Sequence, residues 1–341
     1  WPTCVCDSDL HSTDAVWKPK KPFSSVVCVT VIYIPLMLFG LLGNILTILV
    51  VWLRPHMRSS TYLYLSSMAV SDLLILLLLP LDLYKLWRPR PWLLGDLTCK
   101  LTMFLSECCT FCTILHITFL SLERYVAVCW PITAKTTVTR RRTRALIGCL
   151  WLGAAISAAP VLVMVGVEEN GIKELCRCTD YAVSSGLLAA MMILSNLYFL
   201  VPVFILGLVY SLIGRTLWIR QRRSRKDQTH RHTIKMLGVI VLAFVLCWLP
   251  FHVGRTIFSL SLGSGLYFNL VSSVLYYLSA AVNPLLYNMM STRYRHAVHS
   301  LVHANCNTQP RRAHTTVTAQ NSTTPCWWRQ LHTYWNATSS R

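Results

Sequence analysis

The chain has 341 residues, of which 54% are hydrophobic and only 13% are charged. Soluble domains carry about 25% charged residues, so this composition excludes a set of ordinary soluble domains and favours one membrane domain. The formal net charge is +19. Because the basic residues flank long apolar runs, this charge does not indicate a nucleic-acid partner.

Seven apolar runs follow one another, at roughly 24–52, 61–86, 97–129, 145–167, 184–214, 232–259 and 266–290. Each reaches the ~20 residues that a helix needs to cross a ~30 Å hydrocarbon core. In the second, fourth, fifth, sixth and seventh runs we expect a proline to kink the helix rather than end it; these prolines are Pro80, Pro160, Pro202, Pro250 and Pro284. The sequence predicts an all-α membrane protein, a seven-transmembrane helix bundle.

The basic residues predict the orientation of the bundle. If residue 1 lies outside the cell, the segments on the inner side hold 21 of the 32 Lys and Arg residues. Such an excess marks the cytoplasmic side, so we expect a multi-pass plasma-membrane protein with an extracellular N-terminus and a cytoplasmic C-terminus. The basic run after the fifth apolar segment also suits contact with anionic membrane lipid.

Three parts are expected along the chain. Residues 1–23 form an extracellular N-terminal segment, 24–290 the transmembrane domain, and 291–341 a short amphipathic eighth helix, "TRYRHAVHSLV", followed by a cytoplasmic tail. Cys306 follows the amphipathic stretch and is a candidate palmitoylation site.

The chain has 14 cysteines, and most lie within the apolar runs. Cys99 lies at the outer start of the third run and Cys176 follows the fourth, so both face the oxidising side, where a disulfide persists. A bridge between them would pin the outer loop over the bundle and contribute ~2–4 kcal/mol. The pairing of Cys4, Cys6 and Cys178 stays open.

A series of short motifs occurs in order along the seven runs. It comprises Gly43-Asn44, "MAVSD" ending at Asp72, Cys99, "ERY" at 123–125, Trp151, Pro202, Tyr210, "CWLPFH" at 247–252 and "NPLLY" at 283–287. The set resembles the rhodopsin-like G-protein-coupled receptors over about residues 24–303. The resemblance implies a receptor, not an enzyme, that works with a heterotrimeric G protein, arrestin and receptor kinases.

The resemblance also implies an activation switch. In the off state the acid Glu123 holds Arg124, and activation swings the sixth helix outward and frees the arginine to help form the G-protein cleft. The residues assigned to this switch are Glu123, Arg124, Tyr125, Trp248, Asn283, Pro284 and Tyr287. The alternative for the Glu123–Arg124 pair is a static ion pair that ends the helix.

Asp72 lies at mid-membrane, where an acid is costly. One interpretation is a hydrogen-bonded polar cluster; the other adds an allosteric sodium ion that favours the inactive state. Both use the same side chains, which are Asn44, Asp72, Thr113, Ser279 and Asn283. No other metal or cofactor is expected.

Four stretches are more specific than the general receptor motifs and are similar to the ghrelin and motilin receptor family. They are "RPWLLGDLTCKL", "CTDYAVSSGLL", "YSLIGRTLW" and "FVLCWLPFHVGR". "SSGLL" and "YSLIGR" favour the ghrelin branch, whereas "DLYKLW" and "VTRRRTRALI" favour the motilin branch. The ghrelin-like interpretation implies a peptide hormone, acylated or not, and signalling through Gq, phospholipase C and calcium. The motilin receptor, or a divergent paralogue, is the alternative.

The resemblance implies a ligand site made of Asp82, Met103, Glu107, Phe251, Arg255, Phe258 and Ser273. Glu107 lies about 12 Å along its helix from Cys99, and Arg255 about 10 Å from Trp248, so the two charges can meet across the bundle. The alternative for Asp82 and Arg255 is solvated charge at the rim. Met103 and Ser273 depart from the family, which has glutamine and phenylalanine there.

Two other classes of function fit less well. A transporter or channel needs several mid-membrane charges along a polar path, whereas Asp72 and Glu107 are the main candidates here and belong to no repeat. A membrane enzyme needs a catalytic cluster such as HExxH or paired acids, and the sequence contains none.

Overall fold

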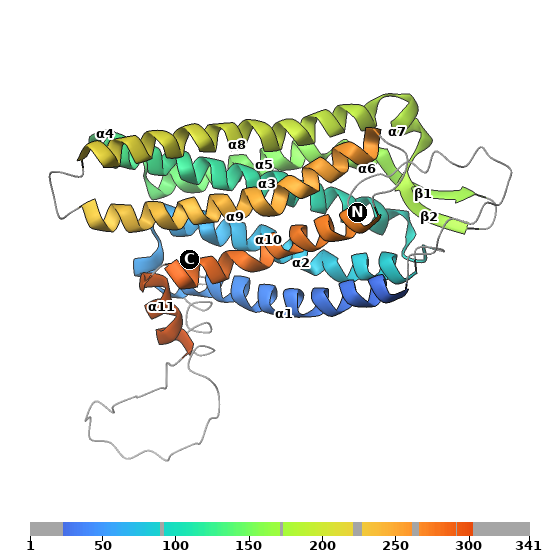
Figure 1. Cartoon of the computed structure of the whole chain (residues 1–341), viewed down its shortest axis with the longest axis horizontal. Helices are drawn as coiled ribbons and strands as arrows, with labels where there is room; N and C mark the ends of the chain where they lie inside the picture. The colour runs from blue at the N-terminus through green and yellow to red at the C-terminus, as the bar shows by residue number, and fades with distance from the viewer. Residues whose placement is uncertain are drawn as a thin grey trace, which may run out of the picture.

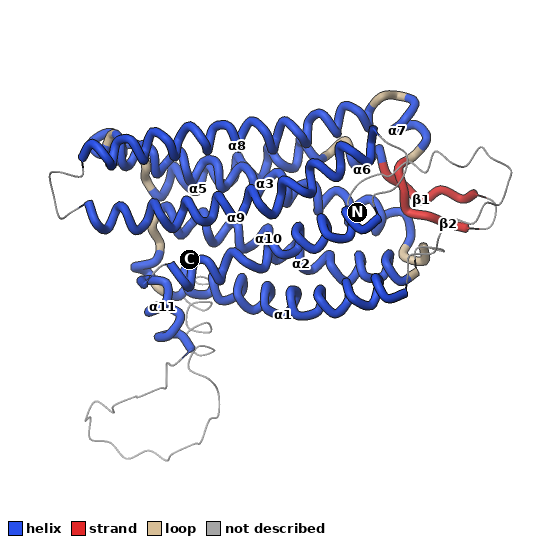
Figure 2. The backbone as a smooth tube through the Cα atoms, viewed as in Figure 1, coloured by secondary structure: helices blue, strands red, loops and turns tan. Residues whose placement is uncertain are grey.

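The computed structural model describes residues 23–88, 92–170, 173–220, 227–260, 266–290 and 292–302. Almost all of this part is helical, apart from one hairpin and short turns (Figure 2). The N-terminal residues 1–22 and the tail from 303, with Cys4, Cys6 and Cys306, lie outside the described residues. The side chains of Phe258 and Tyr287 do too, although their helices are described.

Seven long helices of the described part lie side by side along one axis (Figure 1). They are α1 (Phe23–Leu53), α2 (Ser60–Trp87), α3 (Gly95–Cys129), α5 (Arg140–Ala158), α8 (Leu187–Arg220), α9 (Asp227–Leu260) and α10 (Leu266–Met290). Shorter elements are η2 (Pro55–Met57), α4 (Pro131–Thr137), α6 (Val161–Met164), α7 (Asp180–Ser184) and α11 (Thr292–Val302). The predicted all-α bundle is confirmed.

The distribution of apolar side chains shows what surrounds the bundle. Large apolar residues such as Phe39, Ile156 and Phe204 are exposed on the outer faces of α1, α5 and α8. Water would make this exposure unfavourable, whereas lipid tails accept it. Five helices have the length and apolarity to cross a membrane, and the described parts of α9 and α10 hold shorter apolar stretches at 241–256 and 270–286.

Prolines are accommodated inside five of the described helices. Pro35, Pro80, Pro202, Pro250 and Pro284 lie within α1, α2, α8, α9 and α10. Near one of them, Ser272 Oγ of α10 donates to the carbonyl of Pro250, 3.2 Å away, which links α9 to α10.

The fourth apolar run does not stay helical to residue 167, so that part of the prediction is wrong. α5 ends at Ala158, Pro160 lies in the turn, and α6 stops at Met164. From Val165 the chain becomes β1 (Val165–Asn170), which pairs antiparallel with β2 (Lys173–Cys178). A proline cannot donate a helical hydrogen bond, and the Met164 carbonyl is taken by the backbone N–H of Thr179, 2.9 Å away.

The β1–β2 hairpin defines one end of the bundle, which we call the hairpin end, and α11 lies at the opposite end, the α11 end (Figure 1). At the α11 end, Tyr294 is buried and its hydroxyl lies 2.9 Å from Thr47 Oγ1 of α1. Burial raises the pKa of the Tyr294 phenol, so this hydroxyl keeps its proton. Arg54 Nη2 donates to the Ser300 carbonyl in the last turn of α11, 2.9 Å away, where helix carbonyls lack internal partners.

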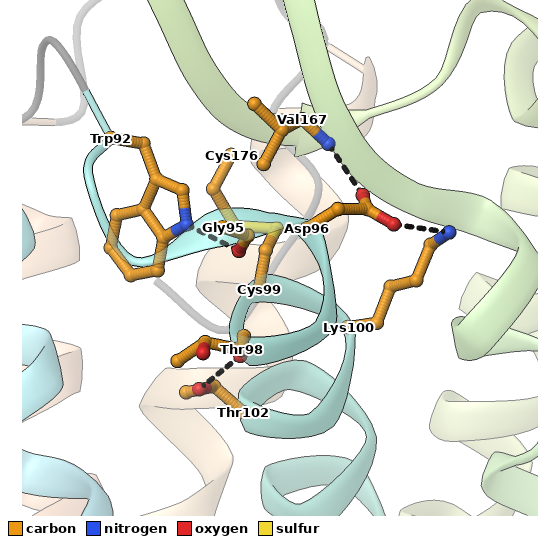
Figure 3. The surroundings of a disulfide bond; sticks show 9 residues. All are labelled: Trp92, Gly95, Asp96, Thr98, Cys99, Lys100, Thr102, Val167 and Cys176. Carbon is orange, nitrogen blue, oxygen red and sulfur yellow. Dashed lines mark hydrogen bonds and ion pairs between the residues drawn. A yellow bond between two sulfur atoms is a disulfide. The ribbon is translucent and has the colours of Figure 1, made fainter.

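At the hairpin end, the predicted disulfide joins Cys99 in the first turn of α3 to Cys176 of β2 (Figure 3). Asp96 adds a second link, because its Oδ1 accepts the backbone N–H of Val167 at 2.9 Å while its Oδ2 pairs with Lys100 at 2.6 Å. Cys178 is also disulfide-bonded. The hairpin is therefore tied to α3 by a covalent bond and by a charge-assisted hydrogen bond.

This arrangement predicts the outcome of removing the bridge. Cys99→Ala and Cys176→Ala should each lower surface expression, because the hairpin loses its anchor on α3. The double variant should be no worse than either single variant, since both changes remove one bond. Flow cytometry of an epitope-tagged receptor would measure this, and losses that add up would contradict it.

Candidate functional site

Trp248 is the centre of an aromatic cluster inside the bundle. The indole of this α9 residue is 1% exposed and contacts Phe251 at 5.8 Å and Tyr276 of α10 at 5.3 Å, both edge-on, measured between ring centroids. Phe244 lies 6.0 Å away on the other side. Any rotation of the indole therefore requires neighbouring rings on α9 and α10 to move, as expected of a packed switch residue.

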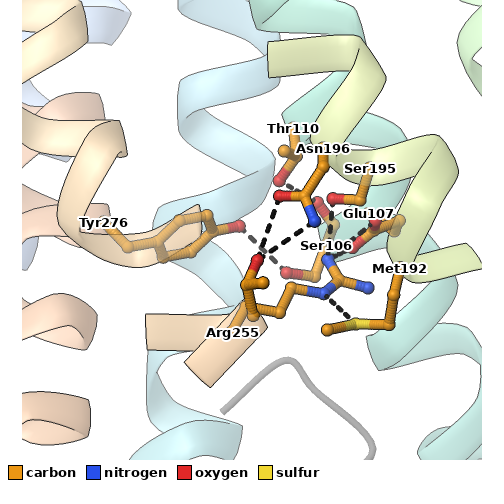
Figure 4. Close-up of polar contacts among 9 residues, drawn as sticks. Ser106, Glu107, Thr110, Met192, Ser195, Asn196, Arg255 and Tyr276 are labelled. Atoms are coloured by element: carbon orange, nitrogen blue, oxygen red, sulfur yellow. Dashed lines mark hydrogen bonds and ion pairs between the residues drawn. The ribbon is translucent and has the colours of Figure 1, made fainter. Parts of the chain in front are cut away.

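Nearer the hairpin end, Glu107 of α3 and Arg255 of α9 form the predicted pair across the bundle (Figure 4). Arg255 Nη1 donates to both carboxylate oxygens, at 2.9 and 3.0 Å. The side chains are only 3% and 7% exposed respectively. Removing either partner would leave an uncompensated buried charge, so the two residues act as a unit.

Residues of α8 complete the surroundings of this ion pair. Ser195 Oγ accepts from Arg255 Nη1 at 3.1 Å, and Met192 Sδ lies 3.2 Å from Arg255 Nε. One residue along, Asn196 Nδ2 donates to Thr256 Oγ1 at 3.0 Å. The ion pair thus ties together α3, α8 and α9. These α8 residues were not predicted, because uncharged side chains in an apolar run carry no signal of which helix face they occupy.

Asp82 and Ser273 lie in a separate polar cluster between α1, α2 and α10. The Tyr277 hydroxyl donates to the buried Asp82 carboxylate, and Lys85 interacts electrostatically with the same acid. Lys85 Nζ also lies 5.1 Å from the Trp92 ring centroid. Ser273 is buried and hydrogen-bonds Tyr33 of α1.

The other two described ligand-site candidates have apolar surroundings. Met103 packs against the cluster of side chains around Trp92 and Cys99. Phe251 stacks on Tyr276, with ring centroids 5.4 Å apart. Of the seven predicted ligand residues, the structure brings Glu107 and Arg255 into direct contact and places Phe251 against Trp248.

In the middle of the bundle, the buried Asp72 carboxylate accepts a hydrogen bond from Asn283 Nδ2 at 2.9 Å. Thr113 Oγ1 lies 2.9 Å from Ser71 Oγ, and Asn44 Nδ2 donates to the Ala280 carbonyl at 3.0 Å. Thr113, Ser279, Asn283 and Trp248 line a small cavity. The five residues assigned to this cluster are all buried.

Close packing of α1 against α10 holds this region together. A Cβ atom on Gly43 would lie 2.8 Å from the Cβ of Pro284, so only glycine allows the two helices to approach this closely. Gly43 and Asn44 therefore have different tasks, the first steric and the second a hydrogen bond to the α10 backbone.

Towards the α11 end, Glu123 Oε1 accepts hydrogen bonds from the Tyr64 hydroxyl at 3.0 Å and from Thr143 Oγ1 at 3.3 Å. Among the residues that the structure describes, no ion pair within 4.0 Å joins Glu123 to the adjacent Arg124. Tyr125 instead stacks edge-on against Trp130, at 5.6 Å between centroids. The Glu123 carboxylate is thus held by hydroxyls of α2 and α5 rather than by its neighbour in sequence.

Comparison with known proteins places this architecture in a class. Residues 43–287 match the 7 transmembrane receptor (rhodopsin family) model. The chain belongs to this family, the rhodopsin-like G-protein-coupled receptors, and is a receptor rather than an enzyme.

Individual relatives are more specific. The chain is 52% identical to growth hormone secretagogue receptor type 1 of Sus scrofa, over 83% of each chain, and 52% identical to that of Homo sapiens, over 80% of each. It is 40% identical to the Homo sapiens motilin receptor, over 86% of this chain and 84% of the relative. The predicted resemblance to this receptor group is confirmed.

The buried ion pair predicts a stability effect that does not depend on any ligand. Arg255→Gln should destabilise the receptor strongly, by about 3–5 kcal/mol, because Glu107 is left buried and unpaired. Glu107→Gln in the same chain should recover part of the loss. Thermal unfolding of the detergent-solubilised receptor would measure both effects.

Lys100→Gln is the matched control, because it breaks an ion pair whose side chains are 35% and 48% exposed and should cost at most ~1 kcal/mol. Strictly additive losses for Glu107→Gln and Arg255→Gln would show that the two charges do not act as a unit.

Proposed function

We propose that this chain is a peptide-hormone receptor of the ghrelin-receptor type that signals through Gq, phospholipase C and calcium. The proposal rests chiefly on the buried Glu107–Arg255 pair, which joins three helices at the hairpin end and lies two turns of α9 from Trp248. The relatives support the ligand class, since the identity to growth hormone secretagogue receptors is 52% and that to the motilin receptor 40%.

The orientation follows from the charges and the disulfide. We place the hairpin end outside the cell, because the Cys99–Cys176 bridge requires an oxidising compartment. The α11 end then faces the cytoplasm, with the inner segments that hold most of the Lys and Arg residues. G protein, arrestin and receptor kinases would bind at this cytoplasmic end of a plasma-membrane receptor.

The contacts suggest how a peptide could act. A peptide amine at the hairpin end would compete with Arg255 for the Glu107 carboxylate. Arg255 would then lose the charge that holds it to α3, while its contacts with Ser195 and Met192 remain on α8. Because Arg255 and Trp248 share α9, a shift of this helix would reach the packed rings around Trp248.

The mid-bundle polar cluster is suited to a sodium ion. Sodium prefers oxygen ligands, and the Asp72 carboxylate, Thr113 and Ser279 provide them beside a small cavity. Asn44 Oδ1 is buried without a hydrogen-bond partner among the described residues, as expected of an oxygen available to a cation or water. Bound sodium would supply positive charge to a buried acid, and the resemblance to this receptor class implies that it binds the inactive state more tightly and so favours it.

Calcium responses of transfected cells to acylated ghrelin, non-acylated ghrelin and motilin test the proposed ligand. We expect a response to a ghrelin peptide, and expect Glu107→Gln to abolish it at equal surface expression, because the peptide amine loses its counter-ion. Asp180→Asn, which removes an exposed acid at the hairpin end, is the control and should respond normally. A response to motilin alone would move the receptor to the motilin branch.

A full, unshifted response from Glu107→Gln would remove the support for this pocket. Cells lacking Gq should lose the calcium signal, whereas a signal that persists without any G protein would contradict the proposed coupling.

The sodium proposal predicts a salt effect on binding. At constant ionic strength, replacing choline by sodium should lower agonist affinity by about fivefold or more, a common size for coupling between two sites. Asp72→Asn should remove the dependence while the receptor still reaches the surface. Equal agonist affinity in both salts for the unmodified receptor would contradict a sodium site.

A further inference from the structure

Glu123 is held by a hydroxyl cluster contributed by two other helices. Its Oε1 accepts from Tyr64 of α2 and from Thr143 of α5. Thr143 Oγ1 also lies 2.9 Å from Ser60 Oγ of α2. Tyr64, Thr143 and Ser60 are all buried. The two hydrogen bonds to Glu123 go to a carboxylate in a partly buried position, so they are stronger than bonds between neutral groups.

The adjacent arginine does not share this cluster. Arg124 Nε and Glu123 Oε2 are both buried without a hydrogen-bond partner within the described part of the chain. Neighbouring residues of a helix do not face each other, so Glu123 and Arg124 form a direct ion pair only when both side chains turn towards each other; at their present separation they still attract each other electrostatically. Here the two side chains follow each other in sequence, yet the carboxylate is turned towards α2 and α5.

The hydroxyls of Tyr64 and Thr143 compete with the Arg124 guanidinium for the Glu123 carboxylate. Each hydrogen bond from Tyr64 or Thr143 stabilises the position in which Glu123 points away from Arg124. A ligand or contact that favours one of two states shifts the equilibrium by its preference for that state. Since the off state of this receptor class has the arginine held by its acid, the hydroxyl cluster favours release of the arginine.

We propose that Tyr64 and Thr143 are positioning residues that hold Glu123 away from Arg124 and thereby raise ligand-independent signalling. This inference rests on the proposed G-protein coupling for its signalling consequence, but its physical basis, the competition for Glu123, can be measured without any signalling.

The first test uses thermal unfolding of the purified full-length receptor. A double-mutant cycle of Glu123→Gln and Arg124→Gln measures how strongly the two side chains interact. The cycle is repeated in a receptor that carries Tyr64→Phe and Thr143→Val, which remove the hydroxyls and keep the shape. We expect the interaction, expressed as the non-additive shift in melting temperature, to be at least about twice as large without the hydroxyls. An unchanged interaction would overturn the proposal.

The second test measures ligand-independent G-protein activation across all G-protein classes at equal surface expression. Tyr64→Phe and Thr143→Val should each lower it about two- to tenfold, the effect of one hydrogen bond on a two-state equilibrium. Thr143→Ser keeps the hydroxyl and should signal like the unmodified receptor. In a Glu123→Gln receptor, which should itself show raised basal activity, neither change should have an effect.

Thr118→Val is the matched control, because this buried threonine donates to the carbonyl of Ile114 in its own helix. Lowered signalling from this control, raised signalling from Thr143→Val, or the same loss in the Glu123→Gln receptor would each overturn the proposal. A receptor that activates no G protein with any peptide would instead contradict the proposed function, and the unfolding cycle would then decide the inference alone.

Discussion

The ion pair between Glu107 and Arg255 is the interaction on which the hairpin end of the bundle depends. Two opposite charges from helices distant in sequence are buried together, and α8 adds Ser195 and Met192 around the guanidinium. Lipid tails cannot form hydrogen bonds or ion pairs with these groups, so their partners must come from neighbouring helices. Under the proposed function, the same pair that holds α3, α8 and α9 in place is the point at which a charged ligand would loosen them.

Polar side chains gather at three levels along the bundle: at the hairpin end, in the middle and towards the α11 end. Each level contains a buried polar atom without a hydrogen-bond partner among the described residues. At the hairpin end, both ring nitrogens of His252 are buried without a hydrogen-bond partner among the described residues. In the middle, Asn44 Oδ1 is likewise buried without a partner in the described part of the chain. Towards the α11 end, the same holds for Glu123 Oε2 and Arg124 Nε. Unsatisfied buried groups are costly, and they recur where a structure has a second arrangement available. Each of these atoms is a donor or acceptor that a water, an ion or a rearranged side chain would satisfy.

The aromatic cluster connects the first two levels. The Trp248 ring lies between Phe244 and Phe251 of its own helix and against Tyr276 of α10. Tyr276 in turn lies 2.9 Å, oxygen to oxygen, from Ser106, the residue before Glu107. A displacement at the ion pair can therefore be passed to Trp248 along α9 itself or through α3 and Tyr276. Dense packing makes such contacts transmit strain rather than absorb it.

The amino-acid sequence alone determined the bundle, because seven apolar runs of membrane length allow few other folds. The family resemblance pointed to Glu107 and Arg255, and helix geometry placed them at similar depth; Cys99 and Cys176 were predicted to pair because both lie on the oxidising side. The prediction for residues 165–167 was wrong, because an apolar run reads the same as helix or strand until a partner strand is known. Only the tertiary structure decided which uncharged groups meet these residues. Ser195, Tyr64 and Thr143 carry no sequence signal, since their role depends on which helix face meets the acid or the arginine, and that is settled by packing between helices.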